Sequence, residues 1–377
     1  MIWRILTGEY PPQRGGVSDY TRLVARGLRA AGDQVHVIAP HTDKAAAIDD
    51  GIVVHRLPGS LGPRALWRID QVLAQDSGRL LVQYVPQAFG TRGMNLPFAM
   101  WLRARRALRP IVMFHEVMFP LERGQPLRRN LLGAATRLMA RLIAQSADRI
   151  LVATPAWAEV LRERVGVRRE VEWLPLPSVI EPFCDETAVR RLRDRFTRPG
   201  DLLVAHFSTY PEQTRELLRA LVPRLLTDDL RAHLLLLGYG NREFLDQLGP
   251  CRERFAGRLH APGALTERDL SLHLSAADLM LQPYPDGANA RRSTLIIALA
   301  HRRCVLTTRG VATEGFWNES GAVMIVEPAE LYSALASLGG DAALRARYAD
   351  RAAALYHDQF QLRWTIARLR GEGCESH

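Results

Sequence analysis

The chain is 377 residues long, with 47% hydrophobic and 24% charged residues, a composition that excludes disordered and fibrous proteins. A chain of this length is expected to form two domains, each large enough to bury its own core. No apolar run approaches the ~20 residues that a bilayer-spanning helix needs, and the first residues lack a signal-peptide pattern. Four cysteines without Cys-x-x-Cys spacing argue against a zinc site or a disulfide framework, so we expect a cytoplasmic protein.

The net charge of +10 lies entirely in the first half of the chain. Residues 1–178 carry 25 Lys and Arg against 15 Asp and Glu, whereas residues 179–377 carry 25 of each kind. A basic half favours an anionic partner, such as a phospholipid surface or a lipid phosphate. We expect no nucleic-acid partner, because no nucleic-acid-binding motif is present and only 7% of the residues are aromatic.

Short apolar runs alternate with amphipathic segments along the chain, which is the pattern of βαβ units with parallel strands. Strands are predicted in the first half at Trp3–Thr7, Gln34–Ala39, Val53–Leu57, Leu80–Val85, Ile111–His115, Arg149–Ala153 and Glu170–Leu174. Strands are predicted in the second half at Leu202–Phe207, His233–Gly238, Asp278–Gln282, Cys304–Thr307 and Ala322–Val326. The helices predicted between them include Val17–Ala31, Leu127–Gln145, Arg242–Phe255 and Ala290–His301.

The proline-rich segment from Leu174 to Pro182 is the predicted linker, because proline removes backbone donors and disfavours helix and sheet. We predict a Rossmann-like N-terminal domain over residues 1–178 and a second Rossmann-like domain over residues 179–345. Residues 346–377 are predicted to form C-terminal helices that return to the first domain. The predicted fold class is α/β, with the two domains facing a central cleft, since ligands of such sheets bind beyond the carboxyl ends of the strands.

The loop after the first predicted strand contains Gly15 and Gly16 and leads into a helix, with Ser18 as the predicted N-cap. Adjacent glycines let the backbone approach a phosphate closely, and free N–H groups at a helix start favour an anion. The same residues also fit an ordinary flexible connection with a Gly-Gly turn, and the sequence leaves both interpretations open.

A second informative loop begins at Pro283 and enters an apolar helix whose first turn holds Arg291 and Arg292. Arginine near a helix N-terminus is unfavourable for the helix dipole. An anion at that place removes the anomaly, because guanidinium groups and helix N–H groups would hold a diphosphate together. The alternative is a pair of solvated surface arginines.

Five segments resemble, in their order and spacing, the family 4 glycosyltransferases of the GT-B fold. They are Thr7–Tyr20, Gly32–Ile38, Thr154–Ala156, Leu236–Gly240 and Ser275–Tyr284. The resemblance covers nearly the whole chain and implies a GT-B fold whose second domain holds the nucleotide-sugar donor and whose first domain holds the acceptor. It also implies retention of configuration at the anomeric carbon. No metal is expected, because no Asp-x-Asp motif occurs, and no cofactor is expected besides the donor as co-substrate.

The resemblance also implies a set of site residues. A His after the predicted strand at residues 111–115 faces the donor sugar in similar enzymes, although His115 also fits a structural role at a strand end. The predicted catalytic residues are His115, Asp286, Arg291 and Arg292. The predicted donor- and phosphate-binding residues are Gly15, Gly16, Ser208, Thr209, Tyr210, Gly238, Tyr239, Gly287, Asn289, Ser293 and Thr294. The Gly238-Tyr-Gly240 segment fits a tight turn equally well.

The chain departs from the family pattern at two places. Family 4 enzymes usually carry two Glu separated by seven residues, but here the pair is either Asp286 and Thr294 or Asn289 and Ile297. The usual Arg and Lys after the first strand of the second domain are replaced by Ser-Thr-Tyr at residues 208–210. We infer that Arg291 and Arg292 supply the positive charge instead, and a degenerate site is the alternative.

The segment from Leu127 to Ile143 is basic and amphipathic, with arginines at 128, 129, 137 and 141. It fits a face that contacts the inner surface of a membrane or a lipid acceptor, and it fits a packed domain helix equally well. The predicted function is a metal-independent glycosyltransferase acting on a saccharide, a lipid-linked glycan or a small molecule. The alternatives are a nucleotide-sugar-binding protein without turnover, a sugar-nucleotide epimerase and, as the weakest, a dehydrogenase.

Overall fold

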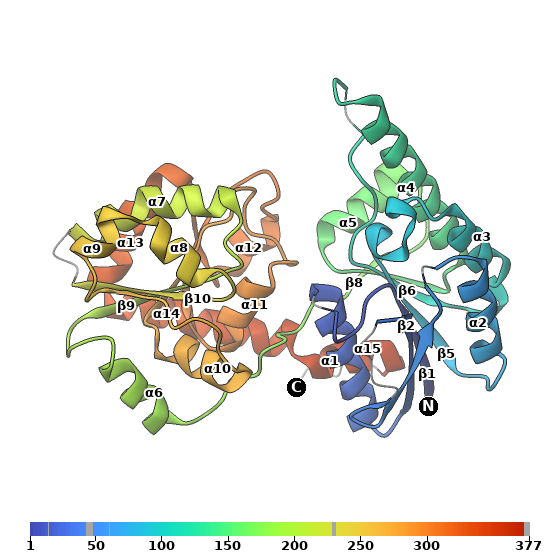
Figure 1. The fold of residues 1–377 in the computed structure, drawn as a ribbon, viewed down its shortest axis with the longest axis horizontal. Coiled ribbons are helices and arrows are strands. Elements are labelled where there is room, and N and C mark those ends of the chain that lie inside the picture. The colour runs from blue at the N-terminus through green and yellow to red at the C-terminus, as the bar shows by residue number, and fades with distance from the viewer. Residues whose placement is uncertain (14, 43–47, 60, 122, 228–230, 373–377) are drawn as a thin grey trace. The chain divides into compact units, whose positions relative to one another are not determined.

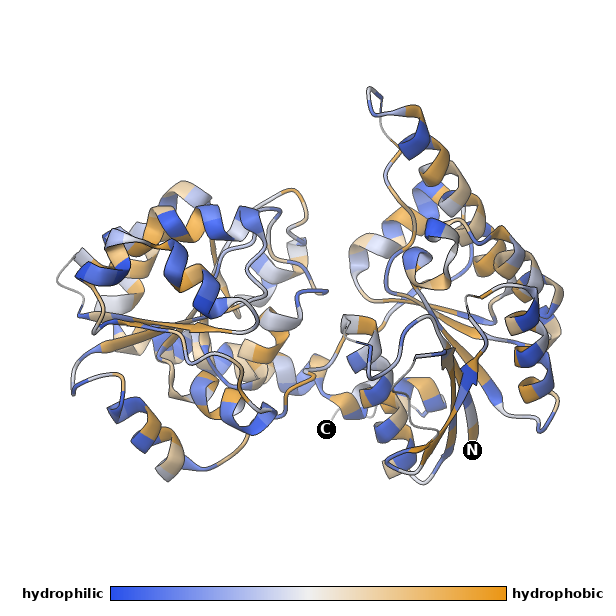
Figure 2. Ribbon diagram, in the orientation of Figure 1, coloured by the Kyte–Doolittle hydropathy of each residue, from blue (hydrophilic) through white to orange (hydrophobic). Residues whose placement is uncertain are grey.

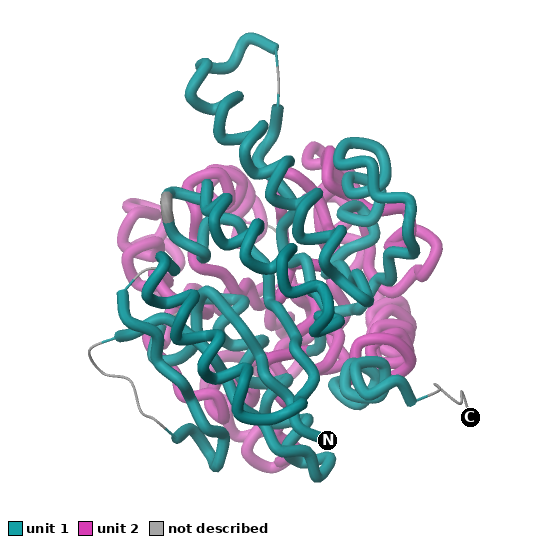
Figure 3. The backbone as a smooth tube through the Cα atoms, turned by 90° about the vertical axis from the view of Figure 1, so that its right-hand side faces the viewer, with its two compact units in different colours: residues 1–177, 362–377 teal, residues 178–361 magenta. Residues whose placement is uncertain are grey.

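The computed structural model describes residues 1–377 except 14, 43–47, 60, 122, 228–230 and 373–377. It divides into two compact units (Figure 3). The first comprises residues 1–177 and 362–377, and the second comprises residues 178–361. The central strands of both units are largely hydrophobic, as Figure 2 shows, because helices cover both faces of each sheet.

The first unit is built on an eight-stranded sheet with the order β3-β4-β2-β1-β5-β6-β7-β8. All pairs are parallel except β3 with β4. The strands are β1 (Ile2–Thr7), β2 (Gln34–Pro40), β3 (Ile48–Asp49), β4 (Ile52–Leu57), β5 (Arg79–Tyr84), β6 (Ile111–Phe114), β7 (Arg149–Val152) and β8 (Glu172–Trp173).

Helices cover both faces of this sheet, and side-chain alternation along the strands supplies a core on each side (Figure 1). Ile5 of β1 packs in the core beneath α1, whereas its neighbour Leu6 packs in the core beneath α2 to α5. Right-handed crossovers explain the division, because α1 connects strands in one direction along the sheet and α2 to α5 in the other. The helices are α1 (Gly16–Ala30), α2 (Pro63–Leu73), α3 (Leu96–Ala104), α4 (Leu127–Ser146) and α5 (Pro155–Val160).

The second unit contains a six-stranded parallel sheet with the order β11-β10-β9-β12-β13-β14. Its strands are β9 (Leu202–Phe207), β10 (Ala232–Leu237), β11 (Leu259–His260), β12 (Leu279–Gln282), β13 (Cys304–Thr308) and β14 (Met324–Val326). Its helices are α6 (Glu186–Asp194), α7 (Glu212–Thr227), α8 (Asn241–Gln247), α9 (Pro250–Arg254), α10 (Glu267–Ala276), α11 (Ser293–Ala300), α12 (Gly315–Ser320), α13 (Leu331–Gly340) and α14 (Ala342–Leu355).

The C-terminal helix α15 (Leu362–Arg370) belongs to the first unit, where it packs against α1. Its side chains Ile366 and Leu369 enter the core that α1 shares with β1. Arginines of the sheet bind its carbonyls: Arg79 donates to the Leu369 carbonyl at 3.2 Å and Arg149 to the Arg368 carbonyl at 2.7 Å. Residues 346–361, which the sequence analysis assigned to the C-terminal segment, lie in the second unit.

The predicted α/β class with two parallel Rossmann-like sheets is confirmed. Two predicted helices differ from the observed ones. The helix predicted over Arg242–Phe255 is broken at Gly249, whose φ is 51°. The helix predicted from Ala290 begins at Ser293; before it, the Ala290 N–H donates to the Glu314 side chain and the Arg291 N–H to the Asn289 side chain. Among the described residues, no helix combines the length and the apolar character needed to cross a membrane.

We predict that replacing Leu369 by Ala lowers the free energy of unfolding of the first unit by about 2–5 kcal/mol, because the change leaves a cavity between α15 and α1. Urea unfolding followed by tryptophan fluorescence tests this, since every tryptophan except Trp317 lies in the first unit. Replacement of the exposed Leu127 by Ala is the matched control, and we expect it to change stability by less than about 0.5 kcal/mol. Equal effects of the two variants would contradict the assignment of α15 to this core.

Candidate functional site

The strand order places a topological switch point in each sheet, where ligands of parallel α/β sheets bind. In the first unit this point lies between β1 and β5, and in the second it lies between β9 and β12. Because the strands are parallel, the loops that follow them meet at the carboxyl edge of each sheet. The predicted site residues lie in or beside these loops, so each unit assembles its own group of them.

In the first unit, His115 follows β6 and is buried. Its Nε2 lies 2.7 Å from Oε1 of Gln83, a buried residue of β5. Since an amide oxygen only accepts, Nε2 is the donor in this contact. The His115 ring also meets the edge of Tyr20 of α1, with ring centroids 5.0 Å apart. These contacts fix the imidazole between the β5 and α1 elements, so its orientation is set before any ligand binds.

The start of α1 already carries an anion of the protein itself. Oε1 of Glu9 accepts hydrogen bonds from the N–H groups of Val17 and Ser18, both at 3.1 Å. A carboxylate there is favoured by the free N–H groups and by the helix dipole. The Glu9 carboxylate therefore occupies two of the N–H groups that the sequence analysis offered to a phosphate.

The Gly-Gly turn is shaped by this carboxylate. A Cβ atom on Gly15 would lie 2.5 Å from Oε1 of Glu9, so a side chain there would displace the end of the Glu9 side chain, whereas a Cβ on Gly16 would meet nothing within 4 Å. Ser18 is not the N-cap that the sequence predicted: Gly15 holds that position, and the Ser18 hydroxyl donates to the Gln13 carbonyl at 2.7 Å. Gly15 thus serves the local turn directly, and phosphate binding at Gly15 and Gly16 stays a prediction.

In the second unit, a pocket of about 420 Å³ opens where β9 and β10 end, on the other side of β9 from the switch point. Two of the predicted donor-binding residues, Gly238 and Tyr239, line it. Buried Asn241 holds the pocket wall together by donating to the carbonyls of Leu236 at 3.0 Å and Gly263 at 3.3 Å. The other lining residues are Phe207, Gly240, Arg242, Glu243, Ala264, Leu265 and Leu270.

The predicted residues after β9 have different environments. The Ser208 carbonyl touches the β10 loop so closely that a Cβ on Gly238 would lie 2.0 Å from it. Tyr210, predicted to bind the donor, instead has its ring in the core, where it stacks on Phe244 at a centroid distance of 5.2 Å. Its hydroxyl donates to the Leu237 carbonyl at 3.0 Å. The Tyr210 side chain therefore supports the fold of this loop, since it is buried and its hydroxyl is already engaged.

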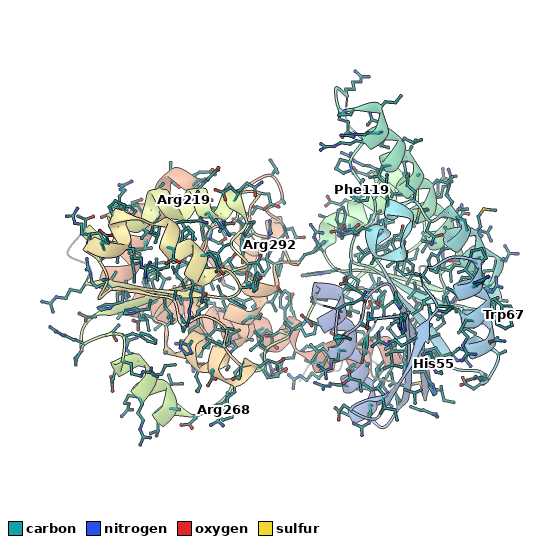
Figure 4. The ribbon with its side chains drawn as sticks, in the orientation of Figure 1. His55, Trp67, Phe119, Arg219, Arg268 and Arg292 are labelled. Carbon is teal, nitrogen blue, oxygen red and sulfur yellow. The ribbon has the colours of Figure 1, made fainter. Side chains whose placement is uncertain are left out.

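A third group of predicted residues gathers in the loop between β12 and α11. The Arg292 guanidinium (labelled in Figure 4) pairs with the Asp286 carboxylate and lies 4.7 Å from the centroid of the Tyr284 ring. The Tyr284 hydroxyl is 2.8 Å from the Thr294 hydroxyl, and burial raises the pKa of Tyr284. Arg291 is exposed to solvent. Thus one guanidinium is held in place by the protein, and its neighbour reaches the surface of the same loop.

This loop is braced by the segment that follows β13. The Glu314 carboxylate accepts from the Ala290 N–H at 2.7 Å, and Thr308 exchanges hydrogen bonds with the backbone of Tyr284. A Cβ on Gly287, whose φ is 97°, would lie 2.1 Å from the Thr313 hydroxyl. Buried Asn289 accepts from the Arg291 N–H at 3.1 Å. Gly287 and Asn289 therefore shape the loop, and the exposed Ser293 begins α11.

Sequence reasoning missed four residues that organise these groups: Glu9, Gln83, Asn241 and Glu314. Asn241 does not cap α8, whose N-cap is Gly240; its amide donates to the carbonyls of Leu236 and Gly263. None of the four has a usable local signal, since each bonds to a partner in a separate element or loop segment. The predicted residues fall into three groups: Gly15, Gly16 and His115; Gly238 and Tyr239; and the loop from Asp286 to Thr294.

Comparison with solved structures finds chains that match nearly the full length. Sucrose-phosphate synthase of Thermosynechococcus elongatus superposes with a TM-score of 0.73 at 16% identity, covering 98% of this chain and 97% of that chain. A glycosyltransferase of Rickettsia africae gives 0.71 at 11% identity, covering 98% and 96%. HepE of Anabaena in complex with UDP gives 0.69 at 14% identity, covering 98% and 99%. Comparison with curated protein sequences finds no match.

These structural matches, together with the two parallel sheets, define the fold class: the chain has the GT-B fold. Residues 14–177 match the model of Glycosyltransferase Family 4. The match agrees with the predicted relationship to family 4 over that part of the chain, while the proposed loss of the family's usual Glu pair and Arg/Lys pair stays a prediction.

We predict that Gly238→Ala disrupts the pocket and that Gly240→Ala leaves it largely intact. Both glycines have positive φ, of 99° and 87°, so both variants carry a similar backbone strain of about 1 kcal/mol. Only at Gly238 does the added Cβ meet backbone, the Ser208 carbonyl at 2.0 Å; at Gly240 the nearest atom is 3.8 Å away. Binding of nucleoside diphosphates by calorimetry should be lost in the first variant alone, and equal losses would show that strain rather than this contact decides the pocket.

Proposed function

We propose that the chain is a glycosyltransferase that moves a sugar from a nucleotide-sugar donor to a saccharide, a lipid-linked glycan or a small molecule. The observation that carries the proposal is the second unit's pocket, which lies at the carboxyl ends of β9 and β10 in a GT-B fold. A volume of about 420 Å³ suits a nucleoside, since small-molecule sites typically enclose roughly 300–1,000 Å³. That HepE was solved with UDP and with UDP-glucose supports the choice of donor class.

In this proposal, Arg291 and Arg292 contact the diphosphate of the donor. The Asp286 carboxylate and the Tyr284 ring position Arg292, so little side-chain entropy is lost when it contacts a phosphate. Arg291 is exposed and adds a second positive charge on the same loop. Guanidinium groups that face a diphosphate stabilise the charge that grows on the leaving group in the transition state. This chemistry requires no metal and no further cofactor.

The proposed reaction retains configuration at the anomeric carbon and uses no enzyme nucleophile. The bond between the anomeric carbon and the β-phosphate oxygen breaks, and the acceptor oxygen forms its bond to that carbon on the same face. The acceptor proton passes to the departing phosphate oxygen, which balances the charge. Positioned beside Gln83 and Tyr20, the His115 imidazole would contribute a hydrogen bond to a sugar hydroxyl of the donor.

A second candidate is a GT-B protein that binds a nucleotide sugar without turnover. The pairing of Asp286 with Arg292 favours it, because the carboxylate at the predicted Glu position is engaged by a cation of the same loop. The two candidates differ in one measurable outcome. The transferase releases nucleoside diphosphate when an acceptor extract is added to the bound donor, whereas the binding protein holds the donor intact.

We predict that Arg291→Ala with Arg292→Ala weakens binding of the donor by about 10- to 100-fold for each guanidinium that contacts the diphosphate. A panel of UDP-, GDP-, ADP- and TDP-sugars in a thermal-shift assay first identifies the base, and calorimetry with that donor then gives the affinity of the variant. The matched control is Arg252→Ala with Arg302→Ala, which removes two exposed arginines that pair with Asp246 and Asp350 elsewhere in the second unit. Unchanged donor affinity in the first double variant would defeat the assignment of the diphosphate to this loop.

A further inference from the structure

Helix α4 exposes a line of large apolar side chains that the proposed transferase chemistry does not use. Leu127, Leu131 and Leu138 are 86%, 64% and 47% exposed. Their spacing of four and seven residues puts them on one side of the helix, with the exposed Ala134 between them. The other side of α4 is anchored, because Met139 and Ile143 are buried in the core of the first unit. The exposed line is therefore a fixed feature of a well-packed helix.

The same helix is strongly basic. Arg128, Arg129, Arg137 and Arg141 are all exposed, and none of its 20 residues is acidic. Two of these arginines stand in the first turn, where the helix dipole disfavours a positive charge. That turn also has no side-chain cap and no acidic residue. A negatively charged surface beside this end of α4 would offset the unfavourable interaction. The positive charge excess of residues 1–178 also favours a negatively charged partner.

The shape of α4 restricts the kind of surface it fits. Its N-terminal half projects beyond the rest of the first unit, in both Figure 1 and Figure 3. A projecting helix is convex, so a protein partner would need a matching groove, and a nucleic acid would leave the leucines without apolar contact. A bilayer surface accepts both kinds of side chain, because leucines enter the acyl boundary while arginines remain at the headgroups.

We propose that the exposed face of α4, formed by Leu127, Leu131, Leu138 and the four arginines, docks the protein on a bilayer that contains anionic phospholipids. The interaction goes beyond the proposed transfer reaction, since no residue of this face belongs to the three groups of site residues. Apolar insertion and headgroup attraction each contribute, so both must be intact for stable attachment. Docking would bring the first unit to the membrane, where a lipid-linked acceptor would be found. Only this link to the acceptor rests on the proposed function.

The experiment is co-sedimentation of the full chain with vesicles of phosphatidylcholine alone or mixed with phosphatidylglycerol. We expect binding to the mixed vesicles that weakens as salt is raised, and little binding to the neutral ones. Leu131→Ser should lower the partition coefficient about tenfold, because one leucine no longer enters the apolar layer. Ile48→Ser is the matched control in the same unit, since Ile48 is 65% exposed and lies on β3.

The electrostatic contribution has its own pair of variants. Arg137→Gln with Arg141→Gln should weaken binding to the mixed vesicles by about tenfold or more, whereas Arg190→Gln with Arg198→Gln, two exposed arginines of the second unit, should not. Circular dichroism confirms that each variant is folded. Absence of vesicle binding by the unaltered chain, or equal effects of Leu131→Ser and Ile48→Ser, would overturn the proposal. So would self-association that Leu131→Ser abolishes without any vesicle binding, which would assign the face to a second copy.

Discussion

Parallel strand pairing is the constraint on which the rest of this structure depends. Every strand pair is parallel apart from β3 with β4, so within each sheet the carboxyl ends of the strands lie along one edge. Loops that are far apart in the sequence therefore meet there. The contact between the Ser208 carbonyl and Gly238, and the hydrogen bond from Ala290 to Glu314, are both consequences of that geometry. The same pairing explains why crossover helices cover both faces and leave the loop edge open to ligands.

Charge within the candidate site is largely balanced by the protein itself. The Glu9 carboxylate accepts from two N–H groups at the start of α1, and the Arg292 guanidinium pairs with Asp286. The Arg292–Asp286 pair is partly exposed, so its main effect is to hold the guanidinium in position and not to add stability. A bound diphosphate would then interact with positions that are already ordered. The exposed arginines of α4 differ, because their helix contains no acidic residue to balance them.

Much of the fold was predictable because it depends on local patterns. Strands such as Leu202–Phe207 and Ala232–Leu237 are apolar except for one His in each, as expected of parallel strands covered on both sides. Helix ends were less predictable. The helix α11 begins at Ser293 and not at Ala290, and the loop residue Ala290 is held by Glu314, which is distant in sequence. Tyr210 has the polarity of a ligand-binding residue, yet its ring is held in the core by Phe244, a contact that no local pattern encodes.

The sequence by itself determined the α/β class, the approximate positions of the strands along the chain and the loops in which candidate site residues lie. It could do so because hydrophobic periodicity and glycine placement are local properties. Only the tertiary structure decided which side chains those loops leave exposed and which they engage. Glu9 at the start of α1, Gln83 beside His115 and α15 on the first sheet all result from long-range contacts. The free energy of such contacts depends on distances between segments that are remote in sequence, and those distances exist only after the sheets have formed.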